Sequence, residues 1–396
     1  MAKRGAERGG ACGDLRRRQK HALPLEKGIV LKSVLYRTDV TISRLYHILD
    51  KCSTVSLKFF QKKSEKCRKS LSEKVHFLEP VGNAFKQTLI MKGAKSMSSV
   101  TSRIKEIQQP RGGYIKPALF AKTVFEDGKV LNEKENVHSS VIGMVVDYMA
   151  RFLMNNDAKE AFIISLFGYN ARLDFLSSYI PADAIKESDI LENDKTITVE
   201  IAKKLLIIQQ DGKNSACNLL EQIKGLDDNS IVAACKIVTY DVWYRNPAVA
   251  MLAKNAEDTN PDHETIDNIR ILIQRSNAFL KEFGPITVDG FTFLEKDSNG
   301  TVIHTGYTDT VDCGDGDFLT KDTIWDFKVS KSPITNKHTL QLLMYYIMGK
   351  HSRMEIYKNI SKLGFFNPRL NTMYVLNTSE IPHEIIKSVE QEVLCY

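Results

Sequence analysis

The chain lacks the features that mark membrane, secreted and disulfide-bonded proteins. No apolar run approaches the roughly 18 residues that a membrane-spanning helix needs, and the N-terminus has no apolar core typical of a signal peptide. The seven cysteines are odd in number and include no Cys-x-x-Cys pair, which argues against a disulfide framework and against a zinc site. We therefore expect a protein of the reducing cytoplasm with no membrane partner.

Motifs for nucleotide hydrolysis and for histidine chemistry are missing as well. No glycine-rich phosphate loop, helicase motif or internal repeat is found, so any ATP-driven function would have to come from a partner. The nine histidines form no cluster, which fits chemistry that needs no histidine base.

Positive charge is concentrated near the N-terminus. The net charge is +7, but residues 1–28 carry +5 and residues 51–75 carry +6, so the other residues together carry −4. The first stretch is expected to be a disordered tail, and the second alternates lysines with aromatic residues. Two interpretations stay open: salt-dependent contact with a nucleic-acid backbone, or a solvated surface with Phe59 and Phe60 in the core.

Length and pattern indicate two folded parts after the tail. The 396 residues suffice for two domains of ordinary size, about 100 to 200 residues each. Residues 29–255 are expected to be mainly helical, because apolar residues recur at helical spacing in segments such as residues 139–154. We expect this region to bind substrate, a protein partner or a second copy of the chain. Residues 256–396 are expected to form an α/β domain.

The most informative segment, residues 315–328, is predicted to be a β-hairpin. A two-residue turn at residues 321–322 would place Asp317 directly opposite Asp326. Because side chains alternate along a strand, these two carboxylates and Lys328 would share one face. The other face, which is expected to be the buried one, carries the aromatic side chains Phe318, Trp325 and Phe327.

Two opposed carboxylates are destabilising unless something neutralises them, and a divalent cation does this well. Oxygen ligands favour Mg²⁺ or Mn²⁺, and Lys328 on the same side could hold or polarise a water. One alternative is a solvated acidic hairpin with a chance Asp-x-Lys. A calcium loop does not fit, because no glutamate closes a twelve-residue pattern after Asp312.

Residues 336–348 are predicted to form a helix with Gly349 as its C-cap. Gln341 and Tyr345 lie four positions apart and therefore share one face of this helix. With the hairpin before it, the order and spacing of these motifs resemble the PD-(D/E)XK nuclease superfamily, and within it the RecB-like branch. The resemblance covers roughly residues 262–396, and the matching residues are Asp317, Asp326, Lys328, Gln341 and Tyr345.

Two assignments stay open within this resemblance. Gly316 stands where the superfamily often has proline, and RecB-like enzymes often read Gly-x-x-Asp, which fits Gly306 to Asp309. Asp309 would need a longer hairpin, so we favour Asp317 and keep Asp309 as the alternative. A further carboxylate is often recruited from a preceding helix. The candidates, each of which could equally be surface charge or a structural ion pair, are Glu264, Glu282 and Asp241.

The resemblance implies a restriction-endonuclease-like αβββαβ core at the C-terminus, after a largely helical N-terminal region. It implies that Asp317 and Asp326, with the backbone carbonyl of Phe327, would bind one or two Mg²⁺ or Mn²⁺ ions. Lys328 would orient the attacking water and stabilise charge on the phosphate, while Gln341 would steady the site or touch the nucleic acid.

The expected function is therefore metal-dependent hydrolysis of phosphodiester bonds, with DNA as the favoured substrate, in genome or antiviral defence or in DNA processing. The alternative is a module with the same fold that binds nucleic acid, or waits for a partner, without constitutive cleavage. The other elements expected around the hairpin are a helix over residues 262–283, strands over 286–295, 300–312, 363–366 and 372–376, and a helix over 381–394.

Overall fold

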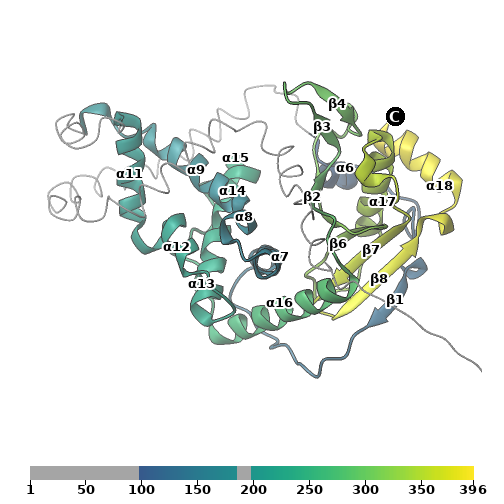
Figure 1. Cartoon of the computed structure of the whole chain (residues 1–396), viewed down its shortest axis with the longest axis horizontal. Helices are drawn as coiled ribbons and strands as arrows, with labels where there is room; N and C mark the ends of the chain where they lie inside the picture. The colour runs from purple at the N-terminus through teal and green to yellow at the C-terminus, as the bar shows by residue number, and fades with distance from the viewer. Residues whose placement is uncertain (1–97, 185–197) are drawn as a thin grey trace, which may run out of the picture.

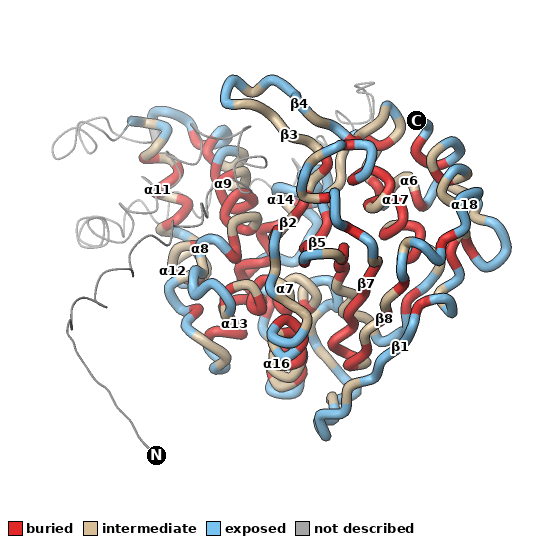
Figure 2. The backbone as a smooth tube through the Cα atoms, turned by 45° about the vertical axis from the view of Figure 1, so that its right-hand side comes forward, coloured by how far each residue is buried: buried red, intermediate tan, exposed pale blue. Residues whose placement is uncertain are grey.

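A computed structural model describes residues 98–184 and 198–396 of the chain. Their buried residues gather in two bodies, one built only of helices and one built around a β-sheet (Figures 1 and 2). Both basic stretches, residues 1–28 and 51–75, lie outside the described residues. Within residues 98–184 and 198–396, no helix is both long enough and apolar enough to cross a membrane.

The helical body surrounds α7 (Ser139–Asn155), whose Ile142, Val145 and Met149 are fully buried. Its apolar spacing predicted this helix, and the structure confirms it. The helices that follow in the chain are α8 (Ala158–Ala161), α9 (Ile163–Ser177), α11 (Val199–Asp211), α12 (Ala216–Gln222), α13 (Asp228–Ile237), α14 (Asp241–Arg245) and α15 (Pro247–Ala250).

A mixed six-stranded sheet forms the centre of the second body. Its strand order is β1-β8-β7-β6-β5-β2, and all neighbours are antiparallel except β6 and β7. This parallel pair needs a crossover, which α17 (Asn336–Ser352) supplies. The strands are β1 (Ala121–Val124), β2 (Val288–Thr292), β5 (Asp315–Leu319), β6 (Thr323–Phe327), β7 (Lys362–Asn367) and β8 (Thr372–Asn377).

The two strands predicted over residues 286–295 and 300–312 are only partly correct. The first divides into β2 and β3 (Leu294–Lys296), and the second is the short β4 (Val302–Thr305), which pairs with β3 in a separate ribbon. The chain leaves this ribbon at Gly306, where a Cβ atom would lie 2.0 Å from the backbone oxygen of Met348. Residues 306–312 are therefore a loop packed against α17 and not a strand.

Both faces of the sheet are buried, whereas only the aromatic face was expected to be. The aromatic face packs under α16 (His263–Phe283), where Phe279 stacks on Phe366 at 4.2 Å and meets Trp325 edge-on at 4.9 Å. On the other face, Leu319 and Ile324 are fully buried in the core that α17 contributes to. The face that carries the hairpin carboxylates is therefore largely covered: Asp326 is buried and Asp317 is half-buried.

Residues before position 256 also belong to the sheet body. The edge strand β1 pairs with β8, and α6 (Val100–Glu106) packs against the same core as α17. Conversely, α16 begins in the helical core and ends under the sheet (Figure 1). The expected boundary near residue 255 therefore does not separate a helical N-terminal part from a sheet-containing C-terminal part.

Two glycines in the central strands allow aromatic rings to lie against the sheet. A Cβ atom on Gly316 would lie 1.9 Å from the ring of Phe291, its partner on β2, and one on Gly364 would lie 2.4 Å from Trp325. This explains why Gly316 precedes Asp317. The prediction that Gly349 is the C-cap of α17 is wrong, because the helix continues past it to Ser352. Gly349 instead makes room for the ring of Tyr357.

The chain ends in a helix that changes its pitch. The segment predicted as one helix over residues 381–394 is α18 (His383–Ser388) followed directly by a π-helix, Val389–Leu394. Val389, Val393 and Leu394 are fully buried in the core beside α17.

The buried Arg275 of α16 ties this helix to the segment after β1 and to the turn between β7 and β8, and we expect its loss to be destabilising. Its guanidinium binds both oxygens of Asp127, at 2.7 and 2.9 Å, and donates to the backbone oxygens of Lys129, Pro368 and Arg369. Arg275→Met removes these five hydrogen bonds, although the Lys129 and Asn371 N–H groups still donate to Asp127 and to the Pro368 carbonyl. The change should lower the free energy of unfolding by about 3–5 kcal/mol, measured by urea denaturation.

Arg270→Met on the same helix is the matched control, because Arg270 is more exposed and should cost no more than about 1 kcal/mol. The hydrogen bond from Arg275 is also the main cause that lowers the pKa of Asp127. The stabilisation from Asp127 should therefore be complete above its unfolded pKa of roughly 4 and be lost as the pH falls below it. Equal costs for the two arginine variants would contradict this assignment.

Candidate active site

The hairpin turn at residues 321–322 forms as the sequence predicted. The Thr320 N–H donates to the Thr323 carbonyl at 3.0 Å, and the ladder pairs Leu319 with Ile324 and Phe318 with Trp325. The ladder stops there, so Asp317 and Asp326 are not a paired register position. Instead, Asp317 Oδ2 accepts the Phe327 N–H at 2.6 Å, which places its carboxylate next to the peptide bond that follows Asp326.

A chain of polar contacts runs from Asp326 to α17. Asp326 is 3% exposed, and Lys328 Nζ lies 2.6 Å from its Oδ2. Lys328 Nζ also donates to Gln341 Oε1 at 3.0 Å, Gln341 Nε2 donates to the Tyr345 hydroxyl at 2.8 Å, and that hydroxyl donates to the Asp315 carbonyl at 2.7 Å. The structure thus brings together Asp326, Lys328, Gln341 and Tyr345, four residues that the motif had grouped.

The carboxylates of Asp317 and Asp326 lie close enough for their negative charges to repel each other. Burial, and then the charge of Asp326, raise the pKa of Asp317 to about 8, against the opposing effects of Lys328 and the Phe327 N–H. Burial alone would lower the pKa of Lys328, but the charges of Asp326 and Asp317 outweigh it and raise that pKa above its ordinary value. Added positive charge at this position would therefore stabilise the ionised pair.

Asp147 of α7 is a third carboxylate at this site, and the sequence analysis did not select it. Its charge is among the causes that raise the pKa of Asp317. Arg151, one turn further along α7, binds Asp147 at 3.0 Å and Asp289 of β2 at 2.9 Å. The signal was present in the sequence, because Asp147 and Arg151 lie four apart within an otherwise apolar helix.

The other candidate acids lie elsewhere. Asp309 is exposed in the loop after β4, where its neighbour Thr310 binds the Leu394 carbonyl. Glu264 is exposed in the first turn of α16, and Glu282, near the end of that helix, lines a separate cavity of about 230 Å³ that also includes Phe366. Asp309 therefore does not replace Asp317, and neither glutamate joins it.

Asp241 is buried within the helical body and not in the hairpin site. Tyr148 and Ser165 each donate a hydroxyl to it at 2.5 Å, while Arg245 lies at 3.7 Å and reaches Asp315 of β5 at the same distance. Burial raises the pKa of Asp241 despite these donors. Asp241 thus holds Tyr148 and Arg245 in place, and both of these side chains line the cleft above the hairpin that is described next.

A cleft of about 700 Å³ opens above the hairpin. Its floor includes Asp317 and Lys328, one wall is α7 from Ser139 to Tyr148, and the opposite wall is the loop after β6. The loop is fixed from below, because Asn367 of β7 donates to the backbone oxygens of Ser330 and Ser332. Solvent therefore reaches Asp317 and Lys328 between the two bodies of the protein.

The donor set fits a hard divalent cation held by few protein ligands. Within residues 98–184 and 198–396, no three His, Cys, Asp or Glu side chains converge as a ready-made metal site. Mg²⁺, however, is usually bound by one or two carboxylates and completes its shell with water and phosphate oxygens. The buried Asp326 Oδ2 is close to Lys328 but accepts no well-aligned hydrogen bond from the described residues, which leaves a lone pair for a ligand.

Comparison with known proteins returned no significant similarity: no protein-family model, curated protein or solved structure matches this chain.

Proposed function

We propose that this protein is a metal-dependent nuclease that hydrolyses phosphodiester bonds in nucleic acid, with DNA as the favoured substrate. The observation that carries the proposal is the position of Asp317 and Lys328 on the floor of an open cleft, with Lys328 held between Asp326 and Gln341. Two carboxylates and a fixed lysine are the groups that metal-assisted attack on a phosphate uses.

The order of elements supports the same proposal. In sequence, α16, β2, β5, β6, α17 and β7 follow one another as α, β, β, β, α and β around the hairpin, with the β3–β4 ribbon inserted after β2. This is the αβββαβ order that the resemblance to the PD-(D/E)XK superfamily implies. The proposal of a restriction-endonuclease-like core rests on this order together with the positions of the motif residues.

Each residue then has a definite task. Asp317 and Asp326, with the Phe327 carbonyl as a further candidate, would hold Mg²⁺ or Mn²⁺, which supplies charge neutralisation and an activated water when bound. Lys328 stabilises negative charge that develops on the phosphate. Gln341 positions the Lys328 ammonium, and Tyr345 fixes Gln341 against the Asp315 carbonyl.

The test is a cleavage assay on linear, circular and single-stranded DNA with Mg²⁺ or Mn²⁺, with the wild type beside Asp326→Ala. The wild type should cleave at least one substrate, and the variant should lose at least about 10²-fold in rate. Equal cleavage by the two proteins would overturn the proposal.

Gly143 of α7 offers a prediction about the catalytic cleft. It lines this cleft, and a Cβ atom there would meet only Val329, at an ordinary 3.9 Å. Gly143→Ala should keep activity and raise the free energy of unfolding by about 0.5–1 kcal/mol, because alanine favours the helix. Gly143→Phe should fill the cleft and lower kcat/KM by at least about tenfold, since misplacing a reacting group by ~1 Å can cost more than that.

The measurement is steady-state cleavage with circular dichroism melting as the check on folding. Loss of activity in the alanine variant, or full activity in the phenylalanine variant, would contradict this placement of the cleft.

One observation favours a second candidate function. The carboxylates in and beside the site are already paired with basic side chains of the protein. Lys328 forms an ion pair with Asp326, and Arg151 forms ion pairs with Asp147 and Asp289. This arrangement suits a module that binds nucleic acid, or awaits a partner, without constitutive cleavage. Tight DNA binding with no cleavage in either metal would select this function.

A further inference from the structure

A second and larger cleft adjoins the catalytic one. It has a volume of about 1070 Å³ and lies between α7, α14 and the loop around residue 258. The two clefts meet along a shared border, so a ligand that leaves the catalytic centre along α7 enters the larger cleft directly. The shared border consists of Ser139, Ser140, Met144, Arg245 and Lys331.

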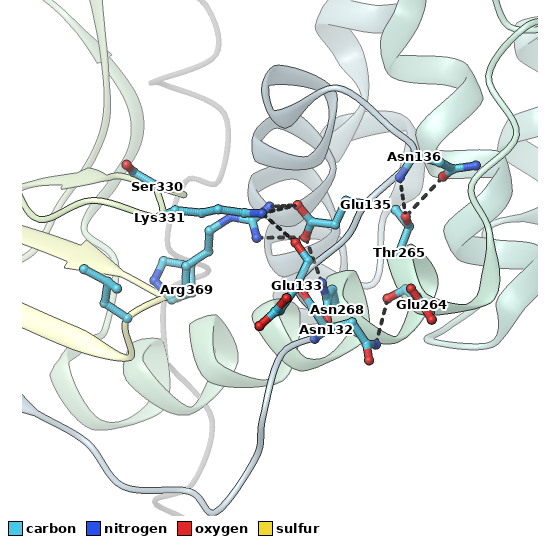
Figure 3. Close-up of polar contacts among 12 residues, drawn as sticks. Asn132, Glu133, Glu135, Asn136, Glu264, Thr265, Asn268, Ser330, Lys331 and Arg369 are labelled. Carbon is cyan, nitrogen blue, oxygen red and sulfur yellow. Dashed lines mark hydrogen bonds and ion pairs between the residues drawn. The ribbon is translucent and has the colours of Figure 1, made fainter.

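Lys331 contributes a positive charge at this border that is only weakly paired. Its neighbour Glu135 is already satisfied, because Arg369 binds both carboxylate oxygens at 2.8 and 2.9 Å and Asn268 donates at 2.9 Å (Figure 3). Lys331 Nζ lies 3.9 Å from Glu135, donates to the Glu133 carbonyl, and its side chain is 65% exposed. The ion pair between Lys331 and Glu135 is therefore long and weak, and the exposed Lys331 ammonium can also bind an anion.

The apolar part of the lining, called the floor, is formed by valine and methionine side chains of α7 and its approach together with Val238, Val242 and Ala253. The rest of the lining is polar and carries both signs of charge, with Lys254 and Lys331 beside Glu135 and Asp258. A cleft lined in this way accepts flat, apolar surfaces such as nucleobases while its rim cations meet phosphates. The apolar lining consists of Val137, Val141, Met144, Val238, Val242 and Ala253.

We infer that the larger cleft binds unpaired nucleic acid that continues from the catalytic centre. Lys331 binds a phosphate at the border, and the apolar floor receives one or more bases. The volume of about 1070 Å³ is slightly above the ~300–1,000 Å³ range of small-ligand pockets, which suits a few unpaired nucleotides and is too small for a duplex segment. The inference rests on the proposed function, because it takes the catalytic cleft as the starting point of the strand.

The test measures binding in EDTA, so that no cleavage occurs, using fluorescence anisotropy of labelled oligothymidylate and of a blunt DNA duplex. Lys331→Ala should lower the salt dependence of single-strand binding by about 0.7 in log–log slope, the value for one phosphate contact. Val141→Glu should place a carboxylate on the apolar floor and weaken single-strand binding at least about tenfold, because a bound base would have to desolvate that charge, while duplex binding stays unchanged.

Lys358→Ala is the matched charge control, because Lys358 is a similarly exposed lysine paired with Glu355 and lines neither cleft. Val141→Leu controls for the fold of α7. Unchanged single-strand binding in both test variants would overturn the inference, as would equal losses for single strand and duplex.

The result separates this inference from the proposed function. If the wild type cleaves DNA while Lys331→Ala and Val141→Glu bind single strands normally, the larger cleft is not the strand site and the nuclease proposal stands. If both variants lose single-strand binding while the wild type cleaves nothing, the strand site stands and the nuclease proposal fails.

Discussion

Lys328→Met is expected to reduce phosphodiester cleavage by about 10²–10³-fold, the cost of removing one preorganised charge-stabilising donor. The ammonium is held in place by Asp326 and Gln341, so its position does not depend on substrate binding. Methionine is unbranched and should fill much of the space of the lysine stem without its charge. The loss should therefore appear in kcat more than in KM.

The same change should affect stability in a way that identifies the ion pair. Asp326 is buried, so removing Lys328 leaves a buried charge without its partner and should cost about 3–5 kcal/mol in metal-free protein. Adding Asp326→Asn to Lys328→Met should recover much of that stability, because the double variant has no unpaired charge. Cleavage should remain lost in the double variant.

Urea denaturation and cleavage rates in Mn²⁺ measure the two effects. Lys328→Arg is the charge-preserving control. A metal-free Lys328→Met protein as stable as the wild type would show that the contact between Lys328 and Asp326 does not stabilise the fold.

Asp317→Asn is expected to stabilise the metal-free protein at alkaline pH while removing its response to divalent cations. Burial beside Asp326 raises the pKa of Asp317 to about 8, far above the roughly 4 of an unfolded aspartate. Between these values the folded state binds a proton that the unfolded state has released. The free energy of unfolding therefore falls as the pH rises from about 4 to about 8.

Asparagine removes this penalty because it does not ionise. The variant should match the wild type near pH 4 and exceed it by a few kcal/mol at pH 9, where one pKa unit corresponds to about 1.4 kcal/mol. Mg²⁺ or Mn²⁺ at 100-fold above its Kd should raise the wild-type stability by about 2.7 kcal/mol and leave the variant nearly unchanged.

Thermal melting across pH, with and without Mn²⁺, makes this comparison. Asp309→Asn is the control, because Asp309 is exposed and does not line the cleft. A wild-type melting temperature that rises from pH 5 to pH 9 relative to Asp317→Asn would contradict the assignment, as would equal metal responses in the two proteins.

Local patterns in the sequence determined the hairpin and the helices that flank it. The turn at residues 321–322, the pairing of Leu319 with Ile324, and the common face of Gln341 and Tyr345 all follow from spacing over a few residues. These features depend on strand alternation and helical periodicity, which act within a single element. The contact of Lys328 with Asp326 also follows from local spacing, because the two residues are two positions apart on one strand face.

Tertiary packing decided what lies around the hairpin. Which helix covers each face of the sheet depends on contacts between distant segments, and so α17 buries the face expected to be open, while β1 joins the sheet from far upstream. The same packing places Asp147 of α7 near Asp317. The spacing of Asp147 and Arg151 singled out this charged pair within an apolar helix, but it could not show which element the pair would face. The sequence by itself therefore determines the pattern of acids and lysine in the hairpin, because that pattern depends on residues close together in the chain. The cleft that makes the hairpin accessible and the larger cleft beyond Lys331 form only where α7 packs near the sheet, and tertiary structure alone decides this.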